Sequence, residues 1–482
     1  MPRRSTFRRA LTADPAALWR WHARPGAFQR LAPPWQRVEA VGPLPALEEG
    51  TRATLRLKVG PFWRRWVARH EDVRPGVGFT DVQERGPFAL WRHVHRFEAA
   101  PTGSVLEDDV TWSLPGGALA HALLGRRVER DLRRVFGWRQ ETTSMDLARH
   151  DTAGLARQRV LVSGSSGLVG SQLVPFLTTG GHEVIRLVRH EPGPGERRWD
   201  PEAASLDPAL FEGVDAVIHL AGAGIADKRW SAARKQQILE SRERGTRLVA
   251  EAMARATHRP RTLVVASAVG VFGSRGDELL DETSAPGDDF LAEVCRRWEA
   301  AAAPAREAGI RTVPTRFGVI LDPRGGALAR MLRPFRMGVG GRLGPGDQWM
   351  GWVALEDVLG ALLHVLATPA LDGPVLVAAP EPVRQATFAR TLGRVLGRPA
   401  FLPMPAWAAR LAFGEVADAL LLASQRPHPA RLLGTGFTFR HTHLEHALRT
   451  MLGRSPASAP AAAAPTTEGK TVREVACSTT SS

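Results

Sequence analysis

The sequence of 482 residues contains no tyrosine and only two cysteines. Without tyrosine, no phenolic hydroxyl is available as a general acid. The two cysteines, Cys295 and Cys477, exclude a disulfide framework and are too few to build a thiolate metal cluster. Lysine is also scarce, and none lies between Lys235 and Lys470. Any proton transfer by this chain must therefore use other groups.

Long apolar segments are missing as well. The first fifteen residues, MPRRSTFRRALTADP, carry charge but no apolar stretch, which argues against a secretory signal. The most apolar long window, 407–424, contains Arg410, Glu415 and Asp418, and is expected to form a buried or amphipathic helix rather than a membrane span. We expect a cytoplasmic protein without stable membrane insertion.

Charge of one sign is in excess, since the formal net charge is +15. Such an excess can indicate a nucleic-acid partner. The arginines are, however, interspersed with acidic residues, as in 126–134, and the sequence has neither zinc-finger spacing nor a basic-aromatic array that would stack bases. We predict no nucleic-acid partner, and the sequence leaves the oligomeric state open.

The first 145 residues alternate between apolar and polar positions with a period of two. This period predicts half-buried antiparallel strands at 51–59, 63–71, 79–83, 91–97 and 104–113. A long amphipathic stretch, 118–140, follows and predicts a helix packed across the sheet, which would enclose an apolar cavity. The polar stretch 146–158 is interpreted as a linker.

The pattern changes at residue 159 to continuous apolar runs that alternate with helical segments. This alternation predicts an α/β fold with a doubly wound parallel sheet over 159–324. The segment 325–453 is expected to pack over the carboxyl edge of the sheet as a substrate-side helical module. The low-complexity tail, 454–482, is expected to be disordered.

A glycine-rich loop, GSSGLVG, joins the first strand of this sheet to a helix at 171–180. Backbone N–H groups and the positive helix end form an anion site there, as in dinucleotide-binding folds. Arg189 follows the next strand, 183–188, where an acid would bind the ribose of NAD, so the sequence favours NADP. The predicted contacts of the loop are Gly164, Ser165, Ser166, Gly167, Leu168, Val169 and Gly170.

Small residues follow the strand over 216–219 and allow the backbone to approach a cofactor closely. These are Leu220, Ala221 and Gly222, although tight packing of a helix on the sheet would require the same glycine. Enzymes with this form of glycine loop usually carry a Tyr-x-x-x-Lys pair, which this chain lacks.

Several motifs together resemble the atypical extended short-chain dehydrogenases/reductases, in the sugar-nucleotide epimerase-like (SulA-type) family. The resemblance covers residues 159–452, including the C-terminal helical module, and implies an NADP-binding Rossmann domain. It also implies that Arg242 reaches the cofactor and that Val319 lies near the nicotinamide. The motifs are GSSGLVG (164–170), VIHLAG (217–222), KRW (228–230), DFLAEVC (289–295), RFGVI (316–320) and GPGDQW (344–349).

The catalytic residues of ordinary extended short-chain dehydrogenases/reductases are all replaced in this chain. By position, Ala268 stands for the catalytic serine, Leu291 for the tyrosine and Cys295 for the lysine. The substitute proton donors that we consider are Cys295, Glu293, Asp289, Glu299 and Ser267, and we predict that Cys295, Ser267 and Glu293 are the catalytic ones. A lone helical cysteine is more often a core residue, so this assignment competes with a structural one.

Residues 1–145 resemble the START-like (SRPBCC) helix-grip superfamily, which implies an apolar small-molecule ligand in the cavity of this domain. The resemblance rests on FTDVQ (79–83), GPF (86–88) and the tryptophan and histidines of 91–95. His93 and His95 lie on one face of a strand and, with Asp81, raise the question of a metal. We interpret them as a cavity-lining or solvent-facing pair and predict no metal site.

Two functions remain open at this point. The first is an NADP(H)-dependent oxidoreductase or epimerase-like enzyme with a nonstandard proton donor, whose substrate is handled by the N-terminal cavity. The second is a non-catalytic NADP(H)-binding sensor or scaffold. A third reading makes the N-terminal domain a transport module and the remainder a relic.

Overall fold

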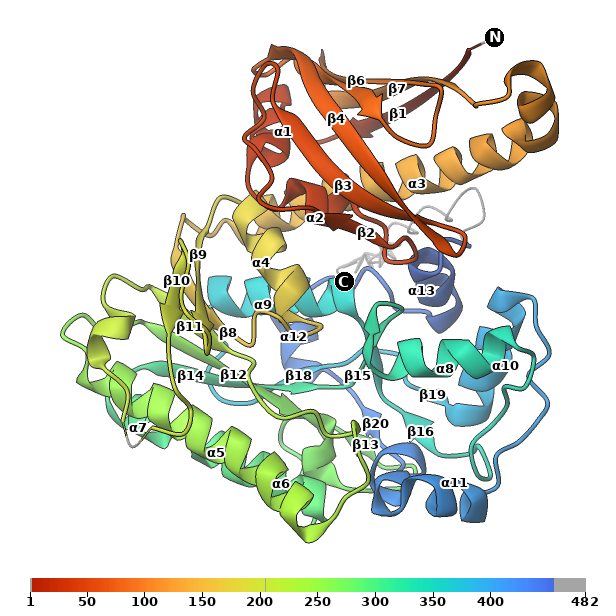
Figure 1. Ribbon diagram of the computed structural model, residues 1–482. Helices are drawn as coiled ribbons and strands as arrows, with labels where there is room; N and C mark the ends of the chain where they lie inside the picture. The colour runs from red at the N-terminus through yellow and green to blue at the C-terminus, as the bar shows by residue number, and fades with distance from the viewer. Residues whose placement is uncertain (1, 204, 455–482) are drawn as a thin grey trace, which may run out of the picture.

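The computed structural model describes residues 2–203 and 205–454, and all of the tail expected to be disordered (454–482) except Arg454 lies outside the described residues. Figure 1 shows an antiparallel sheet domain above a central parallel sheet, with a third, mixed region beside the parallel sheet. The α/β doubly wound sheet preceded by a helix-grip domain is thus confirmed. None of the helices within the described residues has both the length and the apolar character needed to cross a bilayer.

The helix-grip domain contains one seven-stranded antiparallel sheet in the order β1-β7-β6-β5-β4-β3-β2. Inward-facing positions alternate with exposed ones along β6, as the period of two predicts. Every strand predicted in this region is present. The strands are β1 (Arg3–Leu11), β2 (Val38–Ala40), β3 (Arg52–Val59), β4 (Phe62–Arg74), β5 (Gly78–Arg85), β6 (Leu90–Ala100) and β7 (Gly103–Ser113).

Helix α3 (Gly117–Ala153) crosses this sheet, and α1 (Pro15–Ala23) and α2 (Ala27–Leu31) close one end. The predicted helix over 118–140 therefore continues for more than three further turns. Most of the segment interpreted as a linker, 146–158, belongs to it. The polar residues of that segment are compatible with a helix because α3 packs there against the second domain, through ion pairs described below.

The second domain has a seven-stranded parallel sheet in the order β10-β9-β8-β11-β12-β14-β18. The chain enters at β8 and winds first toward β10 and then toward β18, so the strand order reverses between β8 and β11. In doubly wound folds ligands bind at the carboxyl ends of the strands beside such a reversal. The strands are β8 (Arg159–Ser163), β9 (Glu183–Val188), β10 (Glu196–Arg198), β11 (Ala216–His219), β12 (Thr262–Ala268), β14 (Arg311–Phe317) and β18 (Val375–Val377).

Helices cover both faces of the parallel sheet, as Figure 1 shows. On the face toward the helix-grip domain lie α4 (Gly170–Thr179) and α9 (Leu355–Ala367), and on the other α5 (Ala232–Arg255), α6 (Phe290–Ala300) and α7 (Ala303–Glu307). Because β18 and α9 both come from the segment 325–453, that segment completes the sheet as well as forming the expected module beside it.

The remaining elements form the mixed region beside the carboxyl edge. It contains three two-stranded pairs, β13 with β20, β15 with β17 and β16 with β19. The elements are β13 (Leu279–Leu280), β15 (Val319–Asp322), β16 (Trp349–Met350), β17 (Trp352–Ala354), β19 (Val383–Arg384), β20 (Arg426–Pro427), α8 (Gly326–Arg336), α10 (Gln385–Leu396), α11 (Ala406–Phe413), α12 (Ala430–Gly434) and α13 (Leu444–Met451).

A buried ion triad joins the two large domains. Arg30 on α2, 1% exposed, donates two hydrogen bonds of 2.8 Å to Asp146 on α3. Its guanidinium also donates to Glu356 on α9, at 2.6 and 3.3 Å. A second pair, Arg149 to Asp357 at 2.6 Å, lies on the same two helices α3 and α9. These contacts fix the helix-grip domain against the face of the parallel sheet.

Candidate nucleotide site

The glycine loop after β8 is built so that its backbone folds tightly on itself. Gly164 has φ +68°, and a Cβ there would lie 2.8 Å from the carbonyl carbon of Leu220. A Cβ on Gly170, the first residue of α4, would lie 2.3 Å from Gly164 O. By contrast, the nearest atom to a Cβ on Gly167 is Gly164 O at 3.2 Å. The first and last glycines thus close the turn, and the middle one leaves its outer side open.

Ser163 and His219 connect the ends of β8 and β11 beneath this loop. Ser163 Oγ and His219 Nδ1 are 2.7 Å apart, and the same hydroxyl accepts from the N–H groups of Leu220 and Ala221 at 3.2 and 3.3 Å. Burial lowers the pKa of His219 to about 4, so the ring is neutral at pH 7. The network holds the backbone of 220–222 against the glycine loop, where the sequence placed it.

Arg189 is exposed directly after β9, at the carboxyl edge of the sheet. Within the described residues its side chain has no ion-pair partner, whereas the arginines beside it are engaged. Arg186 pairs with Glu196 at 3.0 Å and Arg198 with Glu191 at 3.4 Å. A cation is therefore left available at the position that favours the 2′-phosphate of NADP.

Arg242 on α5 is buried behind the 220–224 segment. It donates to Ala223 O at 2.9 Å, and its guanidinium lies 4.8 Å from the ring centre of Trp298. Burial lowers its pKa to about 10, and its Nε has no hydrogen-bond partner among the described residues. A Cβ on Gly222 would come within 3.3 Å of this side chain. Arg242 thus supports the loop from below, and its contact with a cofactor stays a prediction.

Val319 and Leu168 are two further predicted cofactor contacts, and the position of Val319 near the nicotinamide stays a prediction. Val319 begins β15, and its N–H donates to Gly351 O at 2.7 Å. The side chain of Leu168 lies against the start of α8, within 3.2 Å of a Cβ placed on either Gly325 or Gly326. The glycine loop is therefore packed directly against the mixed region.

Ser267 is engaged by a network that the sequence did not reveal. Its hydroxyl donates to Glu299 Oε1 at 2.6 Å, and Arg316 donates to both oxygens of the same carboxylate at 2.9 Å. The three side chains come from β12, α6 and β14, and Arg316 is 9% exposed. The sequence pattern around Arg316 does not indicate its contact with Glu299 and Ser267. That contact depends on the register of β12 beside β14.

The other two candidate proton donors also have structural surroundings. Cys295 is buried, with Sγ 3.8 Å from Ala268 O, and burial raises the pKa of the thiol to about 11. Glu293 points outward from α6, and its carboxylate pairs with Arg296 at 2.7 Å. Neither residue is placed as an accessible proton donor at the carboxyl edge of the sheet, so the catalytic roles of these residues stay predictions.

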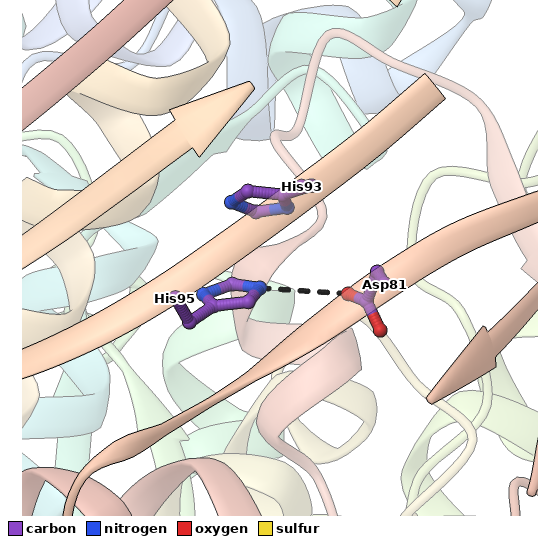
Figure 2. Close-up of side chains that lie close together, drawn as sticks. All are labelled: Asp81, His93 and His95. Carbon is purple, nitrogen blue, oxygen red and sulfur yellow. Dashed lines mark ion pairs between the residues drawn. The ribbon is translucent and has the colours of Figure 1, made fainter. Parts of the chain in front are cut away.

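A second cluster of titratable groups lies on the inner face of the helix-grip sheet (Figure 2). His93 and His95 are 2% and 5% exposed, so the solvent-facing interpretation of this pair is wrong. The inner face points under α3, which buries whatever the strands present there. Besides apolar side chains, the region expected to enclose an apolar cavity thus holds histidines and carboxylates.

Cross-strand pairing explains how this cluster forms. Asp81 on β5 lies opposite both His70 on β4 and His93 on β6, and His95 lies opposite Asp108 on β7. The sequence analysis missed His70 and Asp108, although both fall within predicted strands. Their place opposite Asp81 and His95 requires the strand register, which the alternation alone does not supply.

Charges within the cluster shift the pKa values of the two histidines in opposite directions. Burial and the neighbouring His95 lower the pKa of His93 to about 4. Burial also acts to lower the pKa of His95, but hydrogen bonds with Asp108 and Asp81 outweigh it and raise that pKa to about 9. Burial opposes ionisation of both aspartates, yet the histidines hold the pKa of each carboxyl below its ordinary value.

Comparison with known proteins shows to which family the chain belongs. Residues 160–378 match the model of the NAD dependent epimerase/dehydratase family, and 404–451 match a domain of unknown function, DUF1731. An epimerase family protein of Mycobacterium bovis is 44% identical over 295 residues, 61% of this chain and 97% of that protein. The chain belongs to this epimerase family. The human member SDR39U1 is 37% identical over 297 residues, again 61% of this chain and 99% of its own length.

Solved structures show both parts of the epimerase-family chain. A nucleoside-diphosphate sugar epimerase from Corynebacterium glutamicum superposes with a TM-score of 0.76 at 35% identity, covering 93% of this chain and 90% of that one. Human SDR39U1, solved with NADPH, gives a TM-score of 0.57 at 36% identity, covering 61% of this chain and 99% of that one. Residues 11–141 match the polyketide cyclase/dehydrase and lipid transport family. The fusion of a START-like domain to an epimerase-type Rossmann domain is thus confirmed.

Proposed function

We propose that this epimerase-family chain binds NADP(H) in the glycine cradle and acts as an oxidoreductase or epimerase-like enzyme on a small substrate. The observation that carries the proposal is the combination of a cradle closed by Gly164 and Gly170 with an unpaired Arg189 at the end of β9. The human relative of the same family was solved with NADPH, which supports the choice of nucleotide.

Each part of the cradle has a separate role in this proposal. The N–H groups of the loop and the first turn of α4 would bind the pyrophosphate, since they face an anion with the positive end of the helix. Arg189 would hold the 2′-phosphate by charge-assisted hydrogen bonds. Leu220 and Ala221, fixed by Ser163, would lie along the adenosine side, and Val319 along the nicotinamide.

The bound nicotinamide supplies hydride transfer, and the protein supplies orientation and proton movement. Among the candidates, Ser267 is hydrogen-bonded to Glu299 in a buried network, and Cys295 holds its proton tightly. We infer that the proton required by the reaction comes from groups next to the bound substrate or from solvent at the carboxyl edge of the sheet. Ser267 and Cys295 would then hold β12 and α6 in place behind the substrate.

A nucleotide titration with matched arginine variants tests the cradle. Purified full-length protein is titrated with NADPH and with NADH, followed by nicotinamide fluorescence, for the wild type, Arg189→Ala and Arg157→Ala. Arg157 is the matched control because it is exposed and precedes β8 at the opposite edge of the same sheet. Loss of one charge-assisted contact of about 1.5–3 kcal/mol predicts about a tenfold to hundredfold weaker NADPH binding for Arg189→Ala.

The outcomes separate the parts of the proposal. Weaker NADPH binding in Arg189→Ala alone, with poor NADH binding throughout, supports an NADP(H) site at this edge. Equal losses in both variants would indicate a general charge effect instead. If neither nucleotide binds the wild type, the proposal is wrong and the helix-grip domain becomes the working part of the protein.

A non-catalytic NADP(H) sensor is the second candidate, and the path of α4 favours it. The first turn of this helix forms the cradle, and its last turn contacts the helix-grip domain. Thr178 Oγ1 donates to Pro25 O at 2.6 Å, and Arg24 donates to Thr179 O at 2.9 Å. A Cβ on Gly26 would lie 2.7 Å from Pro175 Cα, so the two surfaces are in direct contact.

Hydrogen exchange measured with and without NADPH distinguishes the two candidates. A sensor requires slower exchange in α1 and α2 when NADPH is bound, without turnover on added carbonyl compounds. An enzyme requires NADPH oxidation with some carbonyl substrate and tolerates unchanged exchange in the helix-grip domain.

We infer that the helix-grip domain takes an apolar small molecule, as the match of residues 11–141 to a lipid-transport family supports. The interior of the helix-grip domain carries stacked aromatic side chains next to the polar cluster. The ring centres of Phe7 and Phe136 are 4.8 Å apart, and the ring planes are nearly parallel. Such a surface suits a ligand that is largely apolar with one polar end. Native mass spectrometry of protein purified without detergent tests for a retained ligand, and binding of polar metabolites only would contradict the inference.

A further inference from the structure

We propose that Asp81, His93 and His95 form a binding site for a divalent zinc-type metal ion inside the helix-grip domain. One ligand atom from each of these side chains lies within 4.8 Å of the other two. Figure 2 shows the two imidazoles one above the other on β6, with the carboxylate of Asp81 facing His95 from β5. The proposal is separate from the nucleotide cradle.

The separations are close to those of a real site. Bonds of about 2.0–2.1 Å to zinc in tetrahedral geometry place ligand atoms about 3.3 Å apart. Asp81 Oδ2 and His95 Nε2 are already 3.4 Å apart, and the ring centres of His93 and His95 are 3.8 Å apart. Because the ligand atoms of all three side chains lie within 4.8 Å of one another, side-chain rotations that shorten the remaining separations to about 3.3 Å would complete a three-ligand set.

Partners outside this set orient each of its members, as in known metal sites. His93 Nε2 lies 3.0 Å from Asp108 Oδ1, which leaves Nδ1 of that ring to face a metal. His95 Nδ1 lies 3.1 Å from the same oxygen, which leaves its Nε2 toward Asp81. Asp81 Oδ1 is held by His70 Nδ1 at 2.7 Å, which leaves Oδ2 free to bind.

Asp108 is itself fixed from the helix. Gln140 on α3 donates to Asp108 Oδ2 at 2.7 Å, so the carboxylate that orients both imidazoles is anchored across the domain. Three protein ligands with an anchored outer layer leave one position of a tetrahedral ion for water or for a ligand. That position would face the interior of the domain proposed to hold a small molecule.

The alternative is a hydrogen-bonded core network without an ion, and two observations disfavour it. Close approach of two imidazole rings gives no hydrogen bond between them. In addition, the Asp108 carboxylate is almost completely buried and the Asp81 carboxylate is partly buried beside it, a costly arrangement that apolar residues would avoid. A divalent cation would take the place of the proton on His95 and balance both carboxylates.

Metal content and spectroscopy of the full-length protein test the proposal. The protein is stripped with a chelator, reloaded with Zn²⁺ or Co²⁺, and its bound metal is measured by mass spectrometry and by visible absorption of Co²⁺. We expect one ion per chain. The variants Asp81→Asn and His93→Gln should lose at least about tenfold in affinity. His121→Gln is the matched control, because His121 is a buried histidine of the same domain that accepts from Leu114 N, outside the cluster.

The result that overturns the proposal is a wild-type chain that binds no Zn²⁺ or Co²⁺, or binding that persists unchanged in both cluster variants. If the variants fail to fold by circular dichroism, anomalous scattering from crystals of the zinc-loaded wild type decides the question. A peak between Asp81, His93 and His95 supports the site, and a peak elsewhere or none refutes it. NADPH affinity should stay unchanged in folded cluster variants, which keeps this test independent of the nucleotide proposal.

Discussion

Replacing Arg30 with methionine should destabilise the protein strongly, because this cation holds two buried carboxylates together. Arg30 makes two hydrogen bonds to Asp146 and two to Glu356. Removal of one partner from a buried ion pair costs about 3–5 kcal/mol. Since the Glu356 side chain is 14% exposed and water can reach one of the two carboxylates, we expect the lower part of this range, about 3–4 kcal/mol.

The loss should depend on pH in a defined direction. In the wild type, burial opposes the charge on Glu356, but Arg30 outweighs it and holds the pKa of that carboxyl below its ordinary value. Its contribution to stability is thus present above the unfolded pKa and lost as the pH falls. In Arg30→Met, Arg440 and Arg324 still act to lower the pKa of Glu356, but burial and the neighbouring Asp146 carboxylate oppose the charge without the largest compensating cation, so protonation relieves the variant. The difference from the wild type should therefore shrink as the pH falls from about 7.5 to about 5.5.

Urea denaturation followed by circular dichroism at both pH values provides the measurement. Arg52→Met is the matched control, because Arg52 makes the same bidentate contact with Glu84 but is 58% exposed. An exposed pair contributes about 0–1 kcal/mol, so this variant should stay near the wild type. Equal stability of Arg30→Met and Arg52→Met, or a loss that grows as the pH falls, would refute the reasoning.

Three further predictions concern the nucleotide site. Gly170→Ala should lower the free energy of unfolding by about 1–3 kcal/mol in urea denaturation, since its Cβ would lie 2.3 Å from Gly164 O. Gly167→Ala should fold normally and weaken only NADPH binding. Ser267→Ala should cost about 1 kcal/mol and leave NADPH affinity unchanged; a loss of affinity in titration would indicate a cofactor contact. Cys295 should resist iodoacetamide in the folded protein, because its pKa of about 11 leaves few thiolates, and rapid labelling in peptide mass spectrometry would contradict this.

The sequence predicted the cradle because all of its determinants are local. The positive φ of Gly164 and the close approach of Gly170 to Gly164 arise within one strand-turn-helix unit, and the position of Arg189 depends only on the end of the next strand. Period-two alternation likewise located five strands of the helix-grip sheet, since it depends only on which face each residue presents, but it missed β1 and β2. These parts were predictable from residue types and spacing alone.

The domain boundaries were harder to predict from the sequence. Helix α3 continues through a stretch that its polar composition marked as a linker, because Asp146 and Arg149 are balanced by charges on α2 and α9 that are distant in the sequence. In the same way β18, from the segment assigned to the third region, completes the parallel sheet beside β14. Both outcomes depend on contacts that no local pattern contains.

The amino-acid sequence by itself determined a glycine-rich turn between a strand and a helix, an arginine directly after the next strand and the absence of the usual tyrosine. Only the tertiary structure decided what surrounds the remaining polar residues. Strand register placed His70 and Asp108 beside the Asp81 cluster, and it joined Ser267 to Glu299 and Arg316. The physical reason is that a cross-strand neighbour is set by pairing and burial across the whole sheet, whereas a turn or a strand face is set by adjacent residues.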